Sequence, residues 1–222
     1  MQAQRESTPP PAGRRYGGRA VADRRAERRL RFIESAIAVF GSRTYRASTL
    51  ADVCSHAKLS RRQFYEEFES REDLLTAAYT RIQDDARSAV LQAIDQAGDA
   101  SVQDTIAEVM AAYVEAVAAD PRRAQLAFVE VVGVSADLET RRRQQRLAWG
   151  KLLESAFRAR LGDSYQPPGG YTLAGQAFVG AVNNVAHEWS LADPRPPRHE
   201  LTALFTALLT PLASQGSEES RA

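Results

Sequence analysis

The chain has 222 residues, of which 44% are hydrophobic and 26% charged, so it can bury a core and is composed like an ordinary globular protein. A single cysteine, Cys54, excludes an internal disulfide framework, no apolar run is long enough to span a membrane, and the signature motifs of nucleotide-binding enzymes, zinc proteases and serine hydrolases are absent. The net charge of +1 conceals an asymmetry: residues 1–62 carry 14 basic and 5 acidic side chains, and residues 63–222 carry 15 and 23. A basic head on an acidic body indicates a polyanion-binding segment, and we expect a cytoplasmic protein without catalytic residues, cofactor, metal or membrane partner.

Residues 1–20 are predicted to form a disordered basic arm, because they are rich in proline and glycine and contain almost nothing to bury. Three arginines lie at its end: Arg14, Arg15 and Arg19. A first helix is then predicted from apolar residues that recur at spacings of three and four, namely Leu30, Ile33, Ile37 and Phe40. Gly41 is a plausible end for this helix.

Two short capped helices are predicted to follow. Thr49-x-x-Asp52 and Ser60-x-x-Gln63 are both capping-box patterns, in which the first side chain caps a helix and the fourth reaches back to it. Only about three residues, 57–59, separate the two helices, which is typical of a helix-turn-helix. We therefore assign residues 21–70 to a three-helix domain of this type.

The remainder of the chain, 71–222, is predicted to be helical as well. No segment shows the sustained alternation of a strand, and each segment instead repeats its apolar residues at helical spacing. The predicted helices span residues 70–98, 102–120, 122–132, 137–161, 171–191 and 201–212. The predicted fold class is all-α.

Residues 40–75 resemble the DNA-binding domain of the TetR/AcrR-type bacterial regulators. The residues that carry the resemblance are Phe40, Tyr45, Ser48-Thr49, Val53-Cys54, Ala57-Lys58-Leu59-Ser60, Tyr65-Glu66-Glu67-Phe68 and Ser70-Arg71-Glu72-Asp73-Leu74-Leu75. Lys58 and Thr44 stand where this family usually has glycine, so Lys58 is expected to adopt the turn conformation at some steric cost. Glu67 stands where histidine is frequent and would place a negative charge near DNA.

The resemblance implies a role for each matching position. Thr49, Tyr65 and Arg71 are expected to contact phosphates, the first through its hydroxyl and the neighbouring helix amides. Arg61, Arg62 and Gln63 open the second short helix, where an arginine can bracket guanine and a glutamine adenine. The full predicted DNA-binding set is Thr49, Lys58, Ser60, Arg61, Arg62, Gln63, Tyr65 and Arg71, with Arg14, Arg15 and Arg19 of the arm. Two alternatives remain open: the arginines of the short helix are merely solvated, and the arm is an inert tail.

The resemblance also implies a helical body that binds a small effector and forms a homodimer. The expected cavity walls are Tyr113, Phe128, Trp149, Phe157 and Phe178, with Asn183 and His187 as polar groups on one helix face. The alternative is that the aromatic residues are ordinary core and that Asn183 crosses a subunit interface. The last helix carries a wide apolar stripe that suits a four-helix interface with a second copy. The predicted interface residues are Leu201, Leu204, Phe205, Leu208 and Leu212.

The predicted function is therefore that of a dimeric transcriptional regulator. We expect a repressor that binds a palindromic double-stranded operator and is released by a small molecule. The first alternative is an activator or a DNA-binding protein without an effector. The second is an all-α enzyme that uses the helix-turn-helix only as a scaffold.

Overall fold

The computed structural model describes residues 15–162 and 165–214, and within these ranges the chain is helical and contains no strand. The all-α prediction is confirmed. The helices are α1 (Arg15–Arg43), α2 (Leu50–Ala57), α3 (Arg61–Tyr65), α4 (Arg71–Ala97), α5 (Val102–Ala118), α6 (Pro121–Ala124), the π-helix η1 (Gln125–Glu130), α7 (Ala136–Leu161), α8 (Gly170–Leu191) and α9 (Arg198–Ser214).

Helix α1 begins earlier than predicted. Its first residue is Arg15, so Arg15 and Arg19 lie on helical backbone and the predicted arm boundary at residue 20 is wrong. The prediction relied on apolar periodicity, which begins only at Leu30, and on the two consecutive glycines at residues 17 and 18, which disfavour a helix. Arg14 and the rest of the predicted arm lie outside the described residues.

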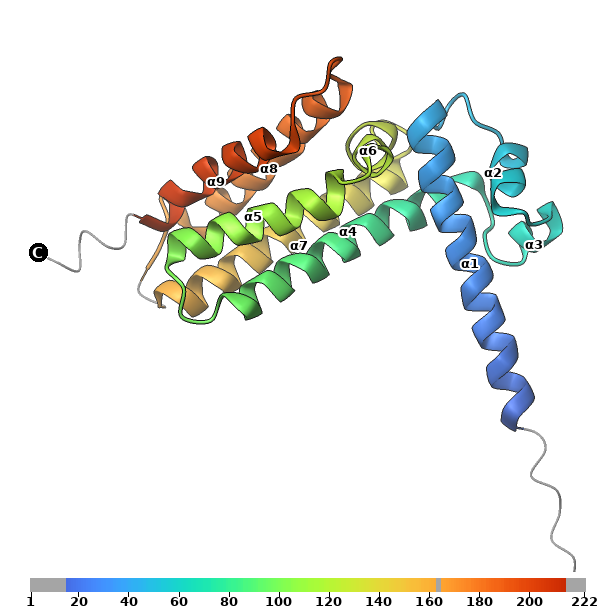
Figure 1. The fold of residues 1–222 in the computed structure, drawn as a ribbon, viewed down its shortest axis with the longest axis horizontal. Coiled ribbons are helices and arrows are strands. Elements are labelled where there is room, and N and C mark those ends of the chain that lie inside the picture. The colour runs from blue at the N-terminus through green and yellow to red at the C-terminus, as the bar shows by residue number, and fades with distance from the viewer. Residues whose placement is uncertain (1–14, 163–164, 215–222) are drawn as a thin grey trace, which may run out of the picture.

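The helices form two parts that share one helix. Helices α1, α2 and α3 lie together at one end of the molecule, and α4 runs from them along the whole body (Figure 1). In the body, α5 packs against both α4 and α9, and α7 packs against both α4 and α8. Because α4 has 27 residues without interruption, the small domain and the body are joined by a rigid element and not by a flexible linker.

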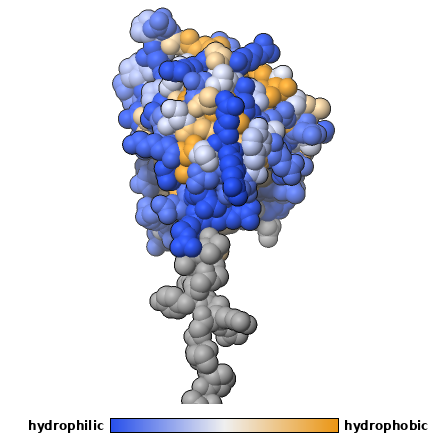
Figure 2. All heavy atoms as spheres, turned by 90° about the vertical axis from the view of Figure 1, so that its right-hand side faces the viewer, coloured by the Kyte–Doolittle hydropathy of each residue, from blue (hydrophilic) through white to orange (hydrophobic). Residues whose placement is uncertain are grey.

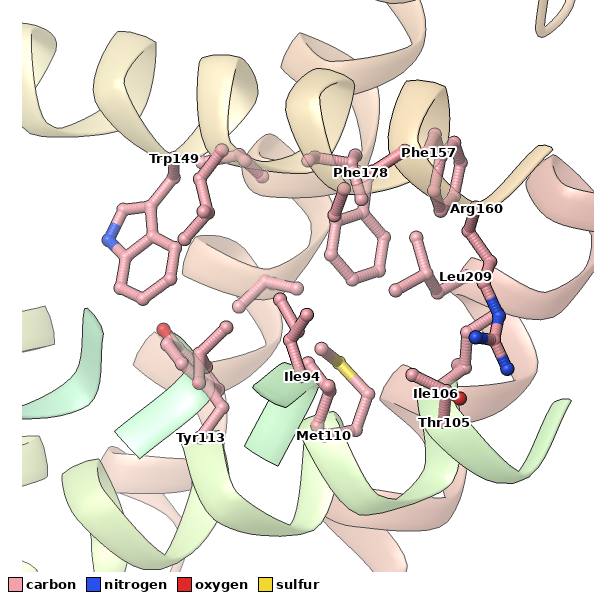
Figure 3. Close-up of a pocket in the computed structure, with 18 of the residues that line it drawn as sticks. Ile94, Thr105, Ile106, Met110, Tyr113, Trp149, Phe157, Arg160, Phe178 and Leu209 are labelled. Carbon is pink, nitrogen blue, oxygen red and sulfur yellow. The ribbon is translucent and has the colours of Figure 1, made fainter. Parts of the chain in front are cut away.

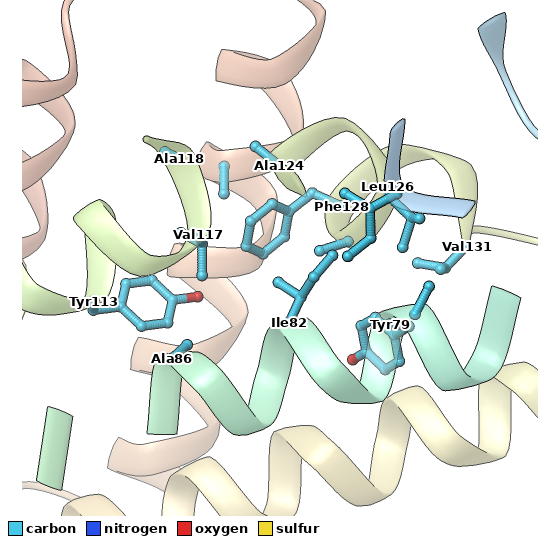
Figure 4. Close-up of a cluster of buried hydrophobic side chains, with 14 of the residues drawn as sticks. Tyr79, Ile82, Ala86, Tyr113, Val117, Ala118, Ala124, Leu126, Phe128 and Val131 are labelled. Carbon is cyan, nitrogen blue, oxygen red and sulfur yellow. The ribbon is translucent and has the colours of Figure 1, made fainter. Parts of the chain in front are cut away.

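The core is continuous from the small domain into the body. Phe32 of α1 makes edge-to-face contacts with Phe64 and Phe68, at centroid distances of 5.5 and 6.2 Å, and these rings fix α3 under α1. In the body, a second cluster joins α4, α5 and the α6–η1 segment around Ile82, Val117 and Phe128 (Figure 4). Both parts are therefore held by buried apolar contacts that include α4.

The segment predicted as a single helix over 122–132 has two parts. A short α-helical stretch, Pro121–Ala124, passes into the π-helix Gln125–Glu130. His187 of α8 donates a hydrogen bond from Nδ1 to the Phe128 carbonyl at 2.7 Å, which satisfies a backbone acceptor inside the π-helix. Single π turns of this kind are frequent at functional positions.

Candidate functional site

The two capping boxes have the predicted geometry. The Thr49 hydroxyl accepts from the Asp52 amide, and the Asp52 carboxylate accepts from the Thr49 amide at 2.8 Å. The Ser60 hydroxyl accepts from the Gln63 amide, and the Gln63 side-chain carbonyl accepts from the Ser60 amide at 2.9 Å. Both predicted caps are confirmed, and they define where α2 and α3 begin.

The connection between α2 and α3 turns at Lys58. This residue has φ 53° and ψ 42°, the left-handed conformation that glycine adopts most easily. Thr44, before the loop that leads to α2, has a positive φ of 72° as well. The turn conformation predicted for Lys58 is confirmed, and the strain falls at the two positions where glycine is usual in the resembling family.

Helix α3 presents basic side chains and an aromatic ring to solvent. Arg61 and Arg62 are exposed, and Tyr65 is 63% exposed with its ring edge against Phe64. Figure 2 looks onto this end of the molecule, where hydrophilic side chains dominate and hydrophobic ones form separate patches. The placement of Arg61, Arg62 and Tyr65 is compatible with the predicted contacts to a nucleic acid.

Two other predicted contact residues are already occupied within the chain. The side-chain carbonyl of Gln63 belongs to the α3 cap, so bracketing an adenine, which needs both the carbonyl and the amide, would require breaking that cap. Arg71 donates to the Tyr45 carbonyl and lies over the Tyr45 ring, 4.5 Å from its centroid. The structure therefore argues against the predicted bidentate role of Gln63 and phosphate role of Arg71.

Glu67 corrects the expectation of a negative charge near DNA. Its side chain is only 1% exposed, and its carboxylate forms ion pairs with Arg25 and Arg28 of α1, each at 3.1 Å. Arg29 donates to the Glu67 backbone carbonyl at 2.7 Å. The carboxylate thus holds the segment after α3 against α1. It pairs with arginines that composition alone assigns to polyanion binding.

A cavity of about 270 Å³ lies in the body between α4, α5, α7, α8 and α9 (Figure 3). Tyr113, Trp149, Phe157, Phe178 and Asn183 line it, as predicted. The wall also contains residues that sequence reasoning missed, and those most relevant to its chemistry are Tyr79, Gln83, Thr105, Met110, Arg146 and Arg160. Two of these residues could have been found from the sequence. Tyr79 and Gln83 are polar residues on the apolar stripe of α4, on either side of the fully buried Ile82.

The cavity end nearest the small domain contains two tyrosines. Burial raises the pKa of Tyr79 to about 12 and raises the pKa of Tyr113 well above its ordinary value. Both hydroxyls therefore stay protonated at neutral pH. Trp149 donates to the Gln83 side-chain carbonyl at 2.8 Å and makes an edge-to-face contact with Tyr113.

Phe128 and His187 do not line the cavity, and the prediction for them is wrong. Phe128 is buried among apolar side chains beneath the π-helix (Figure 4). His187 is turned to the Phe128 carbonyl by the hydrogen bond described above. Their shared role is to hold η1 against α8.

The small domain contacts the body next to this π-helix. The Tyr45 amide donates to the Glu130 carboxylate at 2.6 Å, and the Gln125 side chain donates to the other carboxylate oxygen at 2.9 Å. Gly41 of α1 lies so close to Arg122 of α6 that a Cβ at residue 41 would be 2.8 Å from Arg122 Cα. The α6–η1 segment is therefore fitted closely to α1 and its following loop.

The helix-turn-helix geometry agrees with comparisons to known proteins. Residues 32–78 match the family described as bacterial regulatory proteins, tetR family. Over 128 residues, or 56% of its length, the chain is 28% identical to YezE of Bacillus subtilis (strain 168), an uncharacterized HTH-type transcriptional regulator. Residues 32–78 therefore have the sequence of a tetR-family DNA-binding domain. The aligned region spans 63% of the length of YezE.

Solved structures share the fold over most of the chain. FadR of Bacillus subtilis in complex with stearoyl-CoA is 17% identical, with a TM-score of 0.67 over 83% of this chain and 97% of that one. FadR of Bacillus halodurans, a fatty acid degradation regulator, is 19% identical, with a TM-score of 0.69 over 84% of this chain and 95% of that one. At this identity the likeness concerns the fold alone.

The predicted dimer residues divide between two faces of α9. Leu201 and Phe205 are buried in the protomer's own core, so the prediction that they contact a second copy is wrong. Leu204 and Leu208 are 43% and 38% exposed on another face of the helix, and Leu212 is partly buried. The core-facing and exposed faces of α9 are both apolar. The sequence therefore does not show which leucines pack inside the protomer and which remain on its surface.

Two further searches concern the described residues only. None of their helices is long and apolar enough to cross a membrane. No group of three or more histidine, cysteine or acidic side chains among them could hold a metal ion.

Proposed function

We propose that this protein is a TetR-type regulator, a homodimeric repressor that binds a palindromic operator and is released when a small molecule enters the cavity of the body. Arg61, Arg62 and Tyr65 would contact the operator, the arginines at base edges and the tyrosine at a phosphate. Thr49, Lys58 and Ser60 would lie beside the DNA backbone at the two helix starts and the turn. FadR of B. subtilis, which has the same fold, binds stearoyl-CoA, and this supports a small-molecule site in such a body.

The observation that carries the proposal is the path of α4. Its first residue, Arg71, is fastened to the small domain, and further along the same helix Tyr79 and Gln83 line the cavity. A ligand that alters the packing around α4 therefore acts on a rigid element that begins in the DNA-binding domain. Release requires only that the ligand bind better to the conformer whose two α3 helices are wrongly spaced for the operator.

Selection of bound DNA from a random pool is the direct test. The purified chain is expected to enrich a palindrome with half-sites about one helical turn or more apart. Fluorescence anisotropy with that DNA then gives the affinity, and addition of cell metabolite extracts is expected to lower it. Enrichment of no sequence would contradict operator binding, and an operator complex that no extract affects would favour the ligand-independent alternative.

The dimer interface is proposed on the exposed faces of α8 and α9. Leu204 and Leu208 are four residues apart on one face of α9 and both are exposed, which leaves an apolar patch there, and Leu191 at the end of α8 is 53% exposed. A double variant, Leu204→Glu with Leu208→Glu, is expected to give a monomer by light scattering at micromolar concentration. Leu91→Glu on α4 is a matched control, since this side chain is 47% exposed outside α8 and α9.

The N-terminal residues are proposed to add contacts with DNA. Arg14 precedes α1 in the sequence, and Arg15 and Arg19 lie in its first turns. Each phosphate neutralised steepens the logarithmic dependence of affinity on salt by about 0.9. Deletion of residues 1–19 is expected to reduce that slope by about 3 per subunit. Equal slopes for the full and shortened chains would make this segment an inert tail.

The activator and enzyme alternatives have different readouts. An activator would raise transcription from a reporter carrying the selected operator, where a repressor lowers it. An enzyme would convert a cavity ligand into a product, which mass spectrometry of the recovered ligand would reveal.

A further inference from the structure

The cavity wall is apolar, and most of its polar atoms already have partners. Gln83 accepts from Trp149, and the Thr105 hydroxyl donates to a backbone carbonyl of its own helix turn at 2.9 Å. At the opposite end from Tyr113, Arg160 donates to a backbone carbonyl at 2.7 Å (Figure 3). Each of these groups therefore has at least one partner within the chain.

The Tyr113 hydroxyl is different. The residue is only 7% exposed, its ring is held between Trp149 and Phe205, and its hydroxyl has no hydrogen-bond partner among the residues that the structure describes. Tyr79, 4% exposed on the neighbouring helix, also offers its hydroxyl without a partner within the described ranges, and the hydroxyl end of each ring points toward the other ring (Figure 4). Both residues line the cavity, and a hydroxyl that faces a cavity can donate to an acceptor placed there, so an acceptor supplied by a ligand would be bound here.

The acceptor at this end is favoured as a neutral group. Burial is the main cause that raises the pKa of both tyrosines, so the same surroundings disfavour any anion placed beside them. Arg146 also lines the cavity, and the charges of Arg142, Arg146 and Arg87 lower the pKa of Tyr79, but burial outweighs them and the net shift is upward. A carbonyl or ether oxygen can accept from Tyr113 without this desolvation penalty.

The volume limits the size of the molecule. A protein cavity of about 150 Å³ is large enough to bind benzene. The remaining volume, about 120 Å³, admits roughly four or five further non-hydrogen atoms at the share of about 30 Å³ that each molecule occupies in liquid water. The cavity of about 270 Å³ therefore fits a molecule of about 10 or 11 non-hydrogen atoms.

We propose that the cavity binds a neutral, mainly hydrocarbon molecule of about this size, whose single oxygen acceptor is bound by the Tyr113 hydroxyl and whose apolar part lies among Met110, Phe157 and Phe178. The inference names the ligand class of the same cavity. It rests on the proposed function only in regarding that ligand as the effector that releases DNA. Its binding is measured on the protein without DNA.

Three probes with the same number of carbon atoms test the proposal by calorimetry on the full chain. They are 1-phenylpentan-1-one, pentylbenzene and 5-phenylpentanoate, which carry a ketone, no oxygen and a carboxylate. The ketone is expected to bind about ten-fold more tightly than pentylbenzene, as one hydrogen bond supplies, and more tightly than the carboxylate. Equal affinities for ketone and hydrocarbon would overturn the proposal without the use of any variant.

A pair of matched variants locates the donor. Tyr113→Phe is expected to reduce the ten-fold preference for the ketone to less than about three-fold and to leave pentylbenzene binding unchanged. Tyr171→Phe removes a similarly buried hydroxyl, one that donates to the Tyr165 carbonyl outside the cavity, and is expected to keep the preference. A Tyr113→Phe protein that still prefers the ketone ten-fold would exclude Tyr113 as the donor.

The remaining outcomes separate this inference from the proposed function. Tighter binding of the carboxylate would replace the neutral class by an anion paired with Arg146. Failure of all three probes, in a preparation that binds the selected operator, would overturn the ligand class and leave operator binding intact. Binding of the ketone in a preparation that binds no DNA would support the ligand class and contradict the repressor.

Discussion

Replacing Gly41 by alanine tests whether the close contact between α1 and α6 determines the position of the DNA-binding domain. The new Cβ would lie 2.7 Å from the Cβ of Arg122, 2.8 Å from its Cα and closer still to its carbonyl oxygen. Carbon atoms in contact prefer about 3.5–4.0 Å, so α1 and α6 must separate by roughly 0.7 Å or more. The obstacle is backbone, which cannot rotate away as the end of a flexible side chain can.

The expected cost combines two opposing effects. Overpacking typically costs about 1–3 kcal/mol, whereas alanine in place of glycine inside a helix gains about 1 kcal/mol. We expect Gly41→Ala to lower the free energy of unfolding by about 1 kcal/mol, with a fall of about 2–4 °C in Tm. We also expect weaker operator binding, because the separation displaces α1 from the α6–η1 segment.

Gly150→Ala is the matched control. Gly150 lies in α7, and a Cβ added there meets nothing within 4 Å. This variant is expected to be more stable than the original chain by about 0.5–1 kcal/mol in urea unfolding, with unchanged operator affinity. If both glycine variants are stabilised equally, the inferred tight contact at Gly41 is absent in solution and the reasoning fails.

The remaining predictions concern the DNA-binding domain and the start of α6. Lys58→Gly is expected to raise the free energy of unfolding by about 0.5–1 kcal/mol, because glycine adopts the observed φ of 53° without steric cost, and urea unfolding would detect no gain if the strain were absent. Arg62→Ala is expected to cost about 1–3 kcal/mol of binding free energy on the operator and little on random DNA. Tyr65→Phe should weaken binding to both DNAs by similar factors. Equal losses on both DNAs for Arg62→Ala would mean that another residue reads the sequence. Hydrogen bonds from the side chain and the amide of Arg122 lower the pKa of the Asp120 carboxyl below its usual 3.8, so its contribution to stability is complete above pH 3.8 and is lost as the pH falls through the lowered pKa. Asp120→Asn is therefore expected to be less stable by up to about 1 kcal/mol at pH 7 and no less stable at pH 2, and a difference that persists at pH 2 would contradict the titration.

The local elements of the fold could be predicted because their causes are local. The caps at Thr49 and Ser60 bond to amides only three residues away, so a four-residue pattern contains the whole interaction. The left-handed turn at Lys58 could be predicted because the family pattern places glycine there. The same reasoning located most of the helices from the spacing of apolar residues.

The errors arise where a residue's role depends on elements distant in the sequence. Glu67 looks like a surface charge on a short helix, and only the arrival of Arg25 and Arg28, about 40 residues upstream, makes it a buried anchor. Phe128 and Phe178 are both aromatic residues on apolar helices, yet one is core and the other lines the cavity. Sequence spacing defines which face of a helix is apolar, and the packing of five helices decides where that face leaves a space.

The π-helix also lay beyond prediction, since its extra residue per turn leaves the apolar spacing of a short segment almost unchanged. A period cannot be measured over the six residues Gln125–Glu130. The consequence for the site is large, because the π turn positions Glu130 to accept from the Tyr45 amide.

The uninterrupted course of α4 bears on the construction of hybrid sensors. A designer who wished to redirect this body to a new operator would transplant the first 70 residues of another protein and join them at the start of α4. Such a graft would keep the ligand pocket but would meet Arg122 and Glu130 with side chains chosen for a different neighbour. Since Gly41 and Tyr45 make the matching contacts here, a working chimera would have to import these two residues with the new recognition helix, or exchange the α6–η1 segment together with the transplanted domain.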